Sequence, residues 1–483
     1  MIGAMMCLRL SLVGLATLLL SSCMVGPDYI KPSVPLTPAY KESPPPGDGW
    51  KIAQPSDEIS RGNWWEMFGD PQLNALEEQV AVANQDLQAA EARFREARAM
   101  IRFNRAAEFP TISTGPSISS IRDSRHRPYT TSTFTTSDFL LPFDLSYELD
   151  LWGRVRRTVT AAREEAQATA ADLETARLSL QAELAMDYFE LRSADSQQLL
   201  LNDTVQAFTA ALQLTTNRFA GGAAPMSDVA QAKTQLDTTR VQATDIAVQR
   251  AQFEHAIAIL IGQPPATFSL PPAPLNLQPP AIPVGLPSQL LERRPDIAAA
   301  ERRAAEANEQ IGIARAAFFP TVVLNASAGF EGTSLGNVLM GSSLFWAVGS
   351  SLTQTLFDAG RRRATSDAAF ANYDATVAAY RQTALTAFQQ VEDNLAALRI
   401  LEQEAQQQQQ AVASAQESLQ LFTNRYKGGV DTYLQVVTAQ TIALTNERNA
   451  VDILRRRMDA SALLIKALGG SWQVADLPSL TDG

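Results

Sequence analysis

Strict alternation of apolar and polar residues marks the segment Ser137–Leu151. Every second residue from Phe139 to Leu151 is a large apolar one, and the positions between them are polar and include three acids, with Leu140 and Pro142 as exceptions. A period of two residues predicts a β-strand with one apolar and one polar face. A half-buried strand of a soluble sheet would show the same alternation. The long aromatic face opposite acids favours a strand with lipid on one side and water on the other.

Weaker alternation recurs in three further stretches. The segment after Pro110 is rich in Ser, Thr and Ile, and Leu324–Glu331 and Leu344–Leu356 alternate more clearly. The Gly- and Ser-rich stretch Gly332–Ser343 between the last two suits a hairpin loop. The pattern therefore predicts two strands in each half of the chain.

Helical periodicity without proline dominates the rest. Two stretches of about 65 residues each would span roughly 100 Å as continuous helices. Both end at a Gly-Gly pair and are followed by a shorter helical pattern, so each predicts a helical hairpin. The expected long helices are Gly153–Arg218 and Gly360–Arg425, the returning helices are Met226–Ile261 and Tyr433–Leu468, and the turns are Ala220–Pro225 and Lys427–Thr432.

The landmarks occur twice in the same order. Arg105–Thr111 and Arg315–Thr321 agree at six of seven positions, and in both a helical pattern runs into Phe-Pro and then alternates. Proline cannot continue a helix, so each copy predicts a helix-to-strand junction. The predicted junction residues are Phe109, Pro110, Gly153, Phe319, Pro320 and Gly360. The near-constant offset predicts an internal duplication of roughly 200 residues, which is too long for a solenoid repeat.

The first residues have the form of a secretion signal. Arg9 precedes the apolar run Leu10–Leu20, which is too short to span a bilayer. Leu20-Ser-Ser-Cys23 resembles the lipobox of bacterial lipoproteins, which implies cleavage before Cys23 and acylation of that cysteine. Met24 at the next position favours the outer membrane. An ordinary signal with an incidental cysteine is the alternative, and Cys7 would leave with either signal, so no disulfide can form.

These signals divide the chain into five parts. They are a signal peptide (1–22), a lipid-anchored extended Pro-rich segment (23–62), a first repeat of helix, two strands and a long helical hairpin (63–288), a second repeat (289–470) and a C-terminal tail (471–483).

Composition excludes several functions. The net charge of −11 argues against nucleic acid as a partner. The two histidines, His126 and His255, lie far apart, and no Gly-rich phosphate loop is present. We therefore predict no catalytic residue, no metal site and no cofactor other than the lipid on Cys23.

Four amphipathic strands cannot close a membrane barrel, for which about eight strands are the lower limit. An open sheet edge in lipid would leave N–H and C=O groups unsatisfied at several kcal/mol each. If the strands enter a membrane, the chain must therefore oligomerise.

A set of short motifs resembles one known family across essentially the whole mature chain. The motifs are Cys23 with Gly26-Pro-Asp-Tyr29, Trp64-Trp65 with Asp70-Pro71, Arg294-Pro-Asp296, Ile311-Gly-Ile-Ala-Arg-Ala-Ala-Phe-Phe-Pro320 and Phe357-Asp-Ala-Gly-Arg361. Together they resemble the outer membrane factors of the TolC/OprM type, and within these the NodT-like efflux lipoproteins.

The resemblance implies an α+β membrane protein that forms a homotrimer. Four strands from each protomer would make a twelve-stranded β-barrel in the outer membrane, continued by a long α-helical coiled-coil tunnel through the periplasm. The trimer would be a passive exit duct, lipid-anchored in the outer membrane. A periplasmic adaptor (membrane fusion) protein would connect it to an inner-membrane pump, usually of the resistance-nodulation-division type.

The resemblance also places the two hairpin turns at the periplasmic end, where they close the aperture or contact the adaptor. The implied residues are Arg218, Phe219, Gly221, Gly222 and Asp228 in the first hairpin, and Arg425, Tyr426, Gly428, Gly429, Asp431 and Gln435 in the second. Many relatives carry Asp where this chain has Gln435 and Thr438, which argues against an acidic gate ring unless Asp431 replaces it. Asp228 could instead compensate a helix dipole, and Arg218 and Arg425 could pair with carboxylates across helices or cap helix C-termini.

Three other functions remain to be weighed. An outer membrane component of type I protein secretion would share the fold, although the lipoprotein start favours efflux. A periplasmic coiled-coil adaptor lipoprotein would not need two strand pairs or a duplicated body. An envelope enzyme would need a catalytic constellation that the sequence does not supply.

Overall fold

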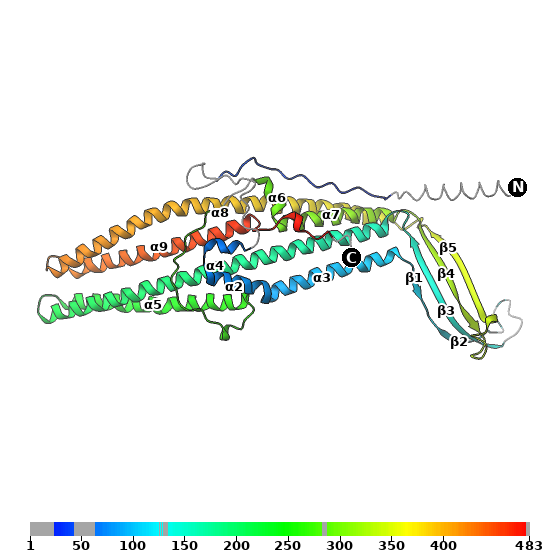
Figure 1. Ribbon diagram of the computed structural model, residues 1–483, viewed down its shortest axis with the longest axis horizontal. Coiled ribbons are helices and arrows are strands. Elements are labelled where there is room, and N and C mark those ends of the chain that lie inside the picture. Colours follow the sequence, from blue (N-terminus) through cyan, green and yellow to red (C-terminus); the bar gives the residue numbers. More distant parts are fainter. Residues whose placement is uncertain are drawn as a thin grey trace.

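Two helical hairpins form about half of the computed structural model, which describes residues 24–42, 63–124, 126, 128, 134–282 and 287–479 (Figure 1). In the first hairpin, α4 (Arg154–Ala220) turns into α5 (Met226–Leu260), and in the second, α8 (Arg361–Lys427) turns into α9 (Tyr433–Ala467). Both long helices have 67 residues and both short ones 35. One constant offset, the 207 positions from Arg154 to Arg361, therefore relates the two hairpins.

Shorter helices precede the strands of each half. They are α2 (Pro71–Ala83), α3 (Gln85–Arg105), α6 (Leu290–Arg293) and α7 (Pro295–Ala316). Along the described chain there are also the 3-10 turns η1 (Trp64–Phe68), η2 (Ala106–Glu108), η3 (Pro265–Thr267), η4 (Pro287–Gln289), η5 (Gly341–Ser343) and η6 (Val474–Asp476). The expected cap of α2 is present, because Asp70 accepts hydrogen bonds from the backbone N–H groups of Gln72 and Leu73 at 2.8 and 3.2 Å. Pro71 starts the helix.

One antiparallel sheet lies at the end of the molecule opposite the hairpin turns (Figure 1). Its strands are β1 (Thr111–Ser113), β2 (Ser117–Arg122), β3 (Thr135–Leu149), β4 (Thr321–Gly332) and β5 (Leu344–Thr353). The described chain thus has five strands where the pattern predicts four. Both β1 and β2 pair with β3, so they form one row that is interrupted at Gly115-Pro116, where proline lacks the N–H for the ladder.

The register assigns each strand residue to a face. Asp144 lies opposite Ser113 and Ser327, whereas Phe143 lies opposite Ala328, which in turn pairs with Trp346. One face is therefore polar and the other apolar, as expected. The apolar face is bare in the single chain, since Trp346 is 74% exposed. β5 and the β1/β2 row are the two edges of this sheet.

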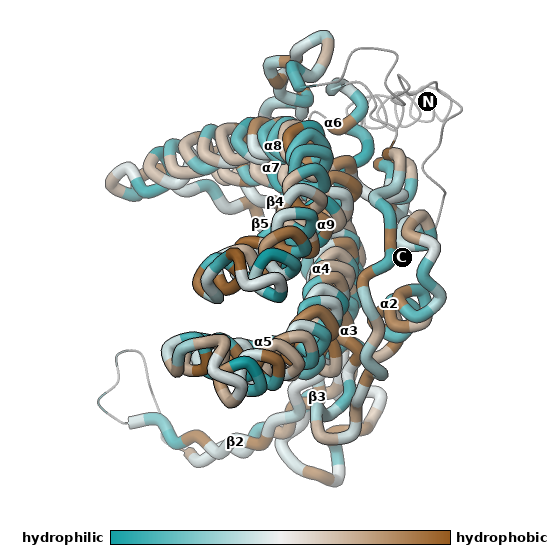
Figure 2. The backbone as a smooth tube through the Cα atoms, turned by 90° about the vertical axis from the view of Figure 1, so that its left-hand side faces the viewer, coloured by the Kyte–Doolittle hydropathy of each residue, from teal (hydrophilic) through white to brown (hydrophobic). Residues whose placement is uncertain are grey.

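Helices lie along an arc when the molecule is viewed from the hairpin turns (Figure 2). The main hydrophobic cluster joins η1 and α2 to the middle of α4 and α8, and its largest buried side chains include Trp64, Tyr188, Phe189 and Tyr380. No helix in the described part of the chain is long and apolar enough to cross a membrane.

The Pro-rich segment is not a free tether over its described residues 24–42. It is extended, as expected, but it lies on the helical body. The Tyr29 hydroxyl donates to Glu301 Oε1 at 2.6 Å, and the N–H groups of Lys41 and Glu42 donate to the Glu392 carboxylate at 2.8 and 3.0 Å. These bonds fix the segment along α7 and α8. Cys23 and the expected signal lie outside the described residues.

Candidate functional site

The hairpin turns are compact and similar. Gly222 and Gly429 have φ of +73° and +76°, a left-handed conformation that favours glycine. Gly221 and Gly428 have φ of −81° and −75°, which other residues adopt readily. Only the second glycine of each predicted pair is therefore required by the backbone.

Arg218 joins the two hairpins at their ends. Its Nη1 donates to the backbone carbonyl of Lys427 at 2.9 Å, and its guanidinium lies 4.8 Å from the centre of the Tyr426 ring. Arg218 thus caps a helix C-terminus, which was one of two alternatives. The helix is α8 of the other hairpin, however, and not its own α4. A charged donor and a cation–π contact hold the two ends together.

Arg425 makes a different contact, although it is the counterpart of Arg218 in the second hairpin. Its Nε and Nη2 lie 2.5 and 3.1 Å from the Asp431 carboxylate within the same turn. Arg425 holds the pKa of Asp431 below its usual range. Asp431 is therefore engaged by a cation, and Gln435, whose N–H bonds the Thr432 carbonyl at 3.2 Å, is exposed and neutral. The second turn presents no unpaired carboxylate at these two positions.

A small hydrophobic cluster lies just above the turns. Tyr426 and Tyr433 are buried with ring centroids 5.1 Å apart, and they pack with Val436 and with Ala232 of the first hairpin. Burial raises the pKa of Tyr433 to about 12, with Tyr426 and Asp228 adding to the shift. Asp228 is itself buried in the first turn of α5. Tyr433 and Val436 were not predicted as site residues, although an aromatic residue directly after the turn was a usable signal.

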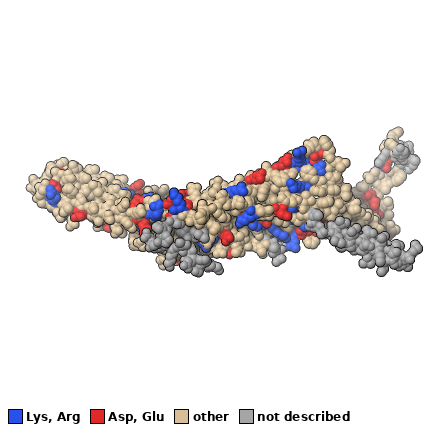
Figure 3. All heavy atoms as spheres, turned by 90° about the horizontal axis from the view of Figure 1, so that it is seen from above, with Lys and Arg blue, Asp and Glu red and all other residues tan. Residues whose placement is uncertain are grey.

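Apolar side chains project from the hairpin ends. Phe219 is 44% exposed, and Met226, Val430 and Leu434 are also exposed. The face drawn in Figure 3 carries few charges at this end, whereas acidic and basic side chains mix over the middle of the body. On this face, the ends therefore present mainly uncharged side chains.

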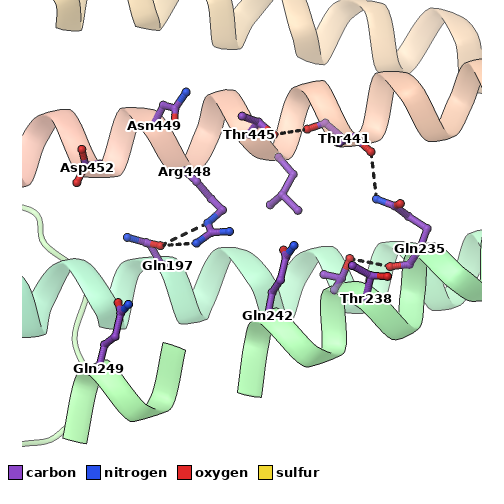
Figure 4. Close-up of a pocket in the computed structure, with 12 residues that line it drawn as sticks. Gln197, Gln235, Thr238, Gln242, Gln249, Thr441, Thr445, Arg448, Asn449 and Asp452 are labelled. Atoms are coloured by element: carbon purple, nitrogen blue, oxygen red, sulfur yellow. Dashed lines mark hydrogen bonds between the residues drawn. The ribbon is translucent and has the colours of Figure 1, made fainter. Parts of the chain in front are cut away.

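A polar groove of about 430 Å³ separates the hairpins further along (Figure 4). The guanidinium of Arg448 on α9 donates to Gln197 of α4 at 3.2 Å, and Gln235 of α5 donates to Thr441 at 3.3 Å. Most other lining residues are also amides or threonines. The hairpins are thus connected here by polar contacts beside a small hydrophobic cluster in which Leu444 of α9 packs with Leu201 of α4 and Ile246 of α5.

A cluster of carboxylates around Arg455 joins α4 to α9 nearer the sheet. Arg455 Nη1 lies 2.6 Å from Glu190 and 2.7 Å from Asp459, and Nη2 lies 2.8 Å from Asp452. Burial raises the pKa of Asp459 to about 7, with further contributions from Glu190 and Asp452. Burial likewise raises the pKa of Asp187 to about 6.

Replacing Asp459 by Asn is expected to flatten the pH dependence of stability. Folded Asp459 keeps its proton up to about pH 7, while an unfolded aspartate loses it near pH 4. The folded state binds more protons in this window, so the free energy of unfolding falls as pH rises through it. D459N should exceed the wild type by roughly 1–3 kcal/mol at pH 8 and match it at pH 4. Denaturation at both pH values checks this, with Asp237→Asn at an exposed position as the control. If the free energy of unfolding changed equally with pH in D459N and the wild type, the prediction would be contradicted.

The helix–strand junctions use similar caps. Gly153 and Gly360 have φ of +79° and +87° and precede α4 and α8. Asp150 accepts hydrogen bonds from two N–H groups at the start of α4, and Asp358 does the same around the start of α8. Asp150, read from the alternation as a strand residue, thus serves the helix instead.

The two Phe-Pro copies differ in their surroundings. Phe319 stacks on Trp152 with centroids 4.7 Å apart, and Trp152 Nε1 donates to the Pro320 carbonyl at 2.8 Å. Phe109, before Pro110, is 61% exposed. The second junction is therefore fixed by the first half of the chain, whereas the first junction is bare.

Replacing Trp152 by Phe keeps an aromatic ring beside Phe319 and removes the N–H donor. The Pro320 carbonyl then loses its partner, so we expect a loss of about 1 kcal/mol in the free energy of unfolding. Chemical denaturation in detergent measures it. A Phe318→Leu variant, whose side chain lies outside this stack, is the control, and an unchanged stability for W152F would show that water replaces the bond.

A buried ion pair lies beneath the N-terminal segment. Arg157 is 1% exposed, and its Nη1 lies 2.8 Å from Glu309 of α7. Gly312 leaves room for the Arg157 side chain, because a Cβ there would lie 2.2 Å from Arg157 Cδ. Gly26 packs directly on Gly312, and Met24 lies against Gly153. Nothing in the sequence pattern indicates that Arg157 and Glu309 meet.

Among the described residues, no group of three His, Cys, Asp or Glu side chains could hold a metal ion.

The comparisons with known proteins agree with this arrangement. The sequence model of the family described as "Outer membrane efflux protein" matches residues 76–263 and 286–470. The chain belongs to the outer membrane efflux protein family. It is 32% identical over 470 residues to the toluene efflux pump outer membrane protein TtgC of Pseudomonas putida, covering 96% of both chains. It is 31% identical over 467 residues to the outer membrane protein OprJ of Pseudomonas aeruginosa, covering 95% of both.

Solved structures of channels share the fold. The outer-membrane channel OprN is 30% identical with a TM-score of 0.85, over 93% of this chain and 99% of that one. The open state of the MtrE outer membrane channel of Neisseria gonorrhoeae is 28% identical with a TM-score of 0.82, over 94% and 99%. These similarities confirm the predicted family and its efflux function. They place this efflux protein in the outer membrane and argue against the adaptor and enzyme alternatives.

Proposed function

We propose that three copies of this efflux protein form the exit duct of a tripartite pump. The duct is passive and does no chemistry, and a periplasmic adaptor connects it to an inner-membrane pump, most simply one of the resistance-nodulation-division type. The supporting observation is that the two ends of the molecule differ. An amphipathic sheet with two free edges lies at one end, and two linked hairpin turns lie at the other (Figure 1).

The sheet favours an assembly. Its exposed apolar face carries Trp346, Val348 and Leu352, which need lipid or protein around them. Its edges need partners in a membrane. Four rows from each of three copies would close a twelve-stranded barrel with the polar face, including Asp144, around the lumen.

The hairpin ends are proposed as the periplasmic gate and adaptor contact. The contact of Arg218 with Lys427 and Tyr426 holds one hairpin against the other, so its loss would let the ends separate. The exposed side chains of Phe219 and Val430 offer the adaptor an uncharged surface. Gln435 and Thr438 supply no carboxylate for an acidic ring, and Asp431 is paired with Arg425.

Acylation of Cys23 is proposed to anchor each copy. The next residue, Met24, lies against Gly153, and the Val25 N–H donates to the Trp152 carbonyl at 3.1 Å. The first described residues after the proposed anchor therefore lie at the junction of sheet and helices, where the membrane would end. Radiolabelled palmitate should enter the wild type and not Cys23→Ser; equal labelling of both would contradict the assignment.

Accumulation of ethidium in cells tests the efflux role. Deleting the gene should raise accumulation, and the wild-type chain should restore export. A variant with both turns, 220–225 and 427–432, replaced by Gly-Ser linkers should reach the outer membrane and fail to restore it, because the adaptor contact is lost. Normal export by this variant would contradict the role of the turns. A defect in protein secretion alone would favour the secretion alternative.

A further inference from the structure

Helix α3 has one free side that its counterpart α7 lacks. Helix α7 lies between α4 and α8, whereas α3 lies against α4 alone among the long helices described. The two correspond residue by residue, because Gln85 and Pro295 begin them and Arg105 and Arg315 begin the motif that follows, both with an offset of 210. The contact of α3 with α4 corresponds to the contact of α7 with α8, since α4 and α8 are also counterparts. The free side of α3 therefore corresponds to the other side of α7, which packs on α4.

The occupied interface between α4 and α7 contains three ion pairs. Glu309 pairs with Arg157 at 2.8 Å, and Arg302 pairs with Glu164 at 3.0 Å. Arg303 pairs with Asp172. These contacts identify which positions of the two helices face each other.

The counterparts of these paired residues are found by subtracting 210 from positions in α7 and adding 207 to positions in α4, and most of them are exposed alanines. Glu309 and Arg157 correspond to Ala99 of α3 and Ala364 of α8, and both alanines are exposed. Arg302 and Glu164 correspond to Ala92 and Ala371, which are also exposed. At two of the three ion pairs, the free sides of α3 and α8 thus carry alanine on both helices. The third pair, Arg303 with Asp172, corresponds to Arg93 and Ala379.

We infer that α3 of a second copy packs on α8, with Ala99 against Ala364 and Ala92 against Ala371. This inference rests on the proposed homotrimer and specifies its helical contact. Within a chain, the small Gly312 of α7 faces the large Arg157 of α4. Between copies, their counterparts would be the large Arg102 of α3 and the small Ala364 of α8, so the large residue would lie on the other helix. At the positions of Ala99, Ala364, Ala92 and Ala371, the contact between copies is therefore lined by alanine instead of by ion pairs.

A flanking ion pair accompanies the alanines. Arg93 corresponds to Arg303, and Asp374 corresponds to Gln167, which accepts a hydrogen bond from Arg302 at 3.3 Å. Both positions thus face the neighbouring helix. Arg93 and Asp374 are exposed and form no ion pair within the described chain. Asp374 corresponds to the residue that contacts Arg302, whose counterpart Ala92 is next to Arg93 in the sequence. Arg93 and Asp374 are therefore near enough to pair between copies.

The sheet agrees with this docking. Within the chain, Gly329 of β4 pairs with Pro142 of β3. Their counterparts by the same offsets are Ser119 of β2 and Gly349 of β5, one on each free edge. Ser119 lies opposite Asp138, and Gly349 opposite Asn325, so both belong to the polar face. Pairing Ser119 of one copy with Gly349 of the next would therefore join β2 to β5 and keep the polar faces of both sheets on the same side. The strand register thus supports the docking independently of the helix contact.

Cysteine cross-linking in outer membranes tests the contact. Ala99→Cys combined with Ala364→Cys, treated with a short thiol-specific cross-linker, should give dimer and trimer bands that neither single variant gives. Cross-linking of the single variants alone would point to a different packing. Trimers by mass without cross-linking would overturn this contact and leave the homotrimer standing. Monomers by mass would overturn both.

Charge reversal tests the ion pair separately. R93D and D374R should each lower the temperature at which the oligomer dissociates in SDS, and the double variant should restore it. Additive losses in the double variant would overturn the pair.

Discussion

Replacing Arg218 by Ala will release the two hairpin ends from each other. The change removes a charged hydrogen bond to the Lys427 carbonyl and a cation–π contact with Tyr426. Together these contribute about 2–4 kcal/mol per copy. Summed over the three copies of the proposed trimer, the loss exceeds the roughly 5.5 kcal/mol that moves a two-state equilibrium from 1:99 to 99:1. Single-channel conductance in planar bilayers should rise, and cells should become permeable to large antibiotics such as vancomycin.

The counterpart arginine supplies the matched control. Arg425 lies at the equivalent position of the second hairpin, but it pairs only with Asp431 of its own turn among the described residues. R425A should therefore leave conductance close to that of the wild type. Equal effects of R218A and R425A would show that the contact between hairpins does not hold the ends together.

The largest loss of stability is expected from Glu309→Ala. This change leaves the Arg157 guanidinium, which is 1% exposed, without its carboxylate partner. Breaking a buried pair on one side costs about 3–5 kcal/mol, because an uncompensated charge stays buried. Thermal and chemical denaturation of the purified protein in detergent should show this loss.

Two controls separate burial from charge loss. Asp172→Ala breaks an ion pair between the same helices, but both partners are 43% exposed, so it should cost about 0–1 kcal/mol. The double change of Arg157→Met and Glu309→Leu should recover most of the stability, because it removes both buried charges. A loss from E309A no larger than that from D172A would contradict the account of this pair.

Local rules explain why the elements could be predicted. The long hairpins follow from helical periodicity without proline and from glycine pairs at their ends, and their observed bounds lie within two residues of the predicted ones. The strand containing Phe143 followed from its period of two. The interruption at Gly115-Pro116 was not predicted, because alternation there was already weak.

Contacts between distant segments could not be predicted in the same way. Composition showed that residues 24–42 are extended, but not that Tyr29 and Glu42 bind the helical body. The sequence offered two roles for Arg218 without showing which helix end lies beside it. Glycine at 312 and arginine at 157 become meaningful only once α4 and α7 are adjacent.

The mass of the complex extracted by detergent from purified outer membranes tests the central proposal most directly. Mass photometry or light scattering with correction for detergent would measure it. A mass of three chains would agree with a barrel assembled from three sets of four strand rows. A chain that stays monomeric, or that fractionates with the inner membrane, would contradict the exit duct.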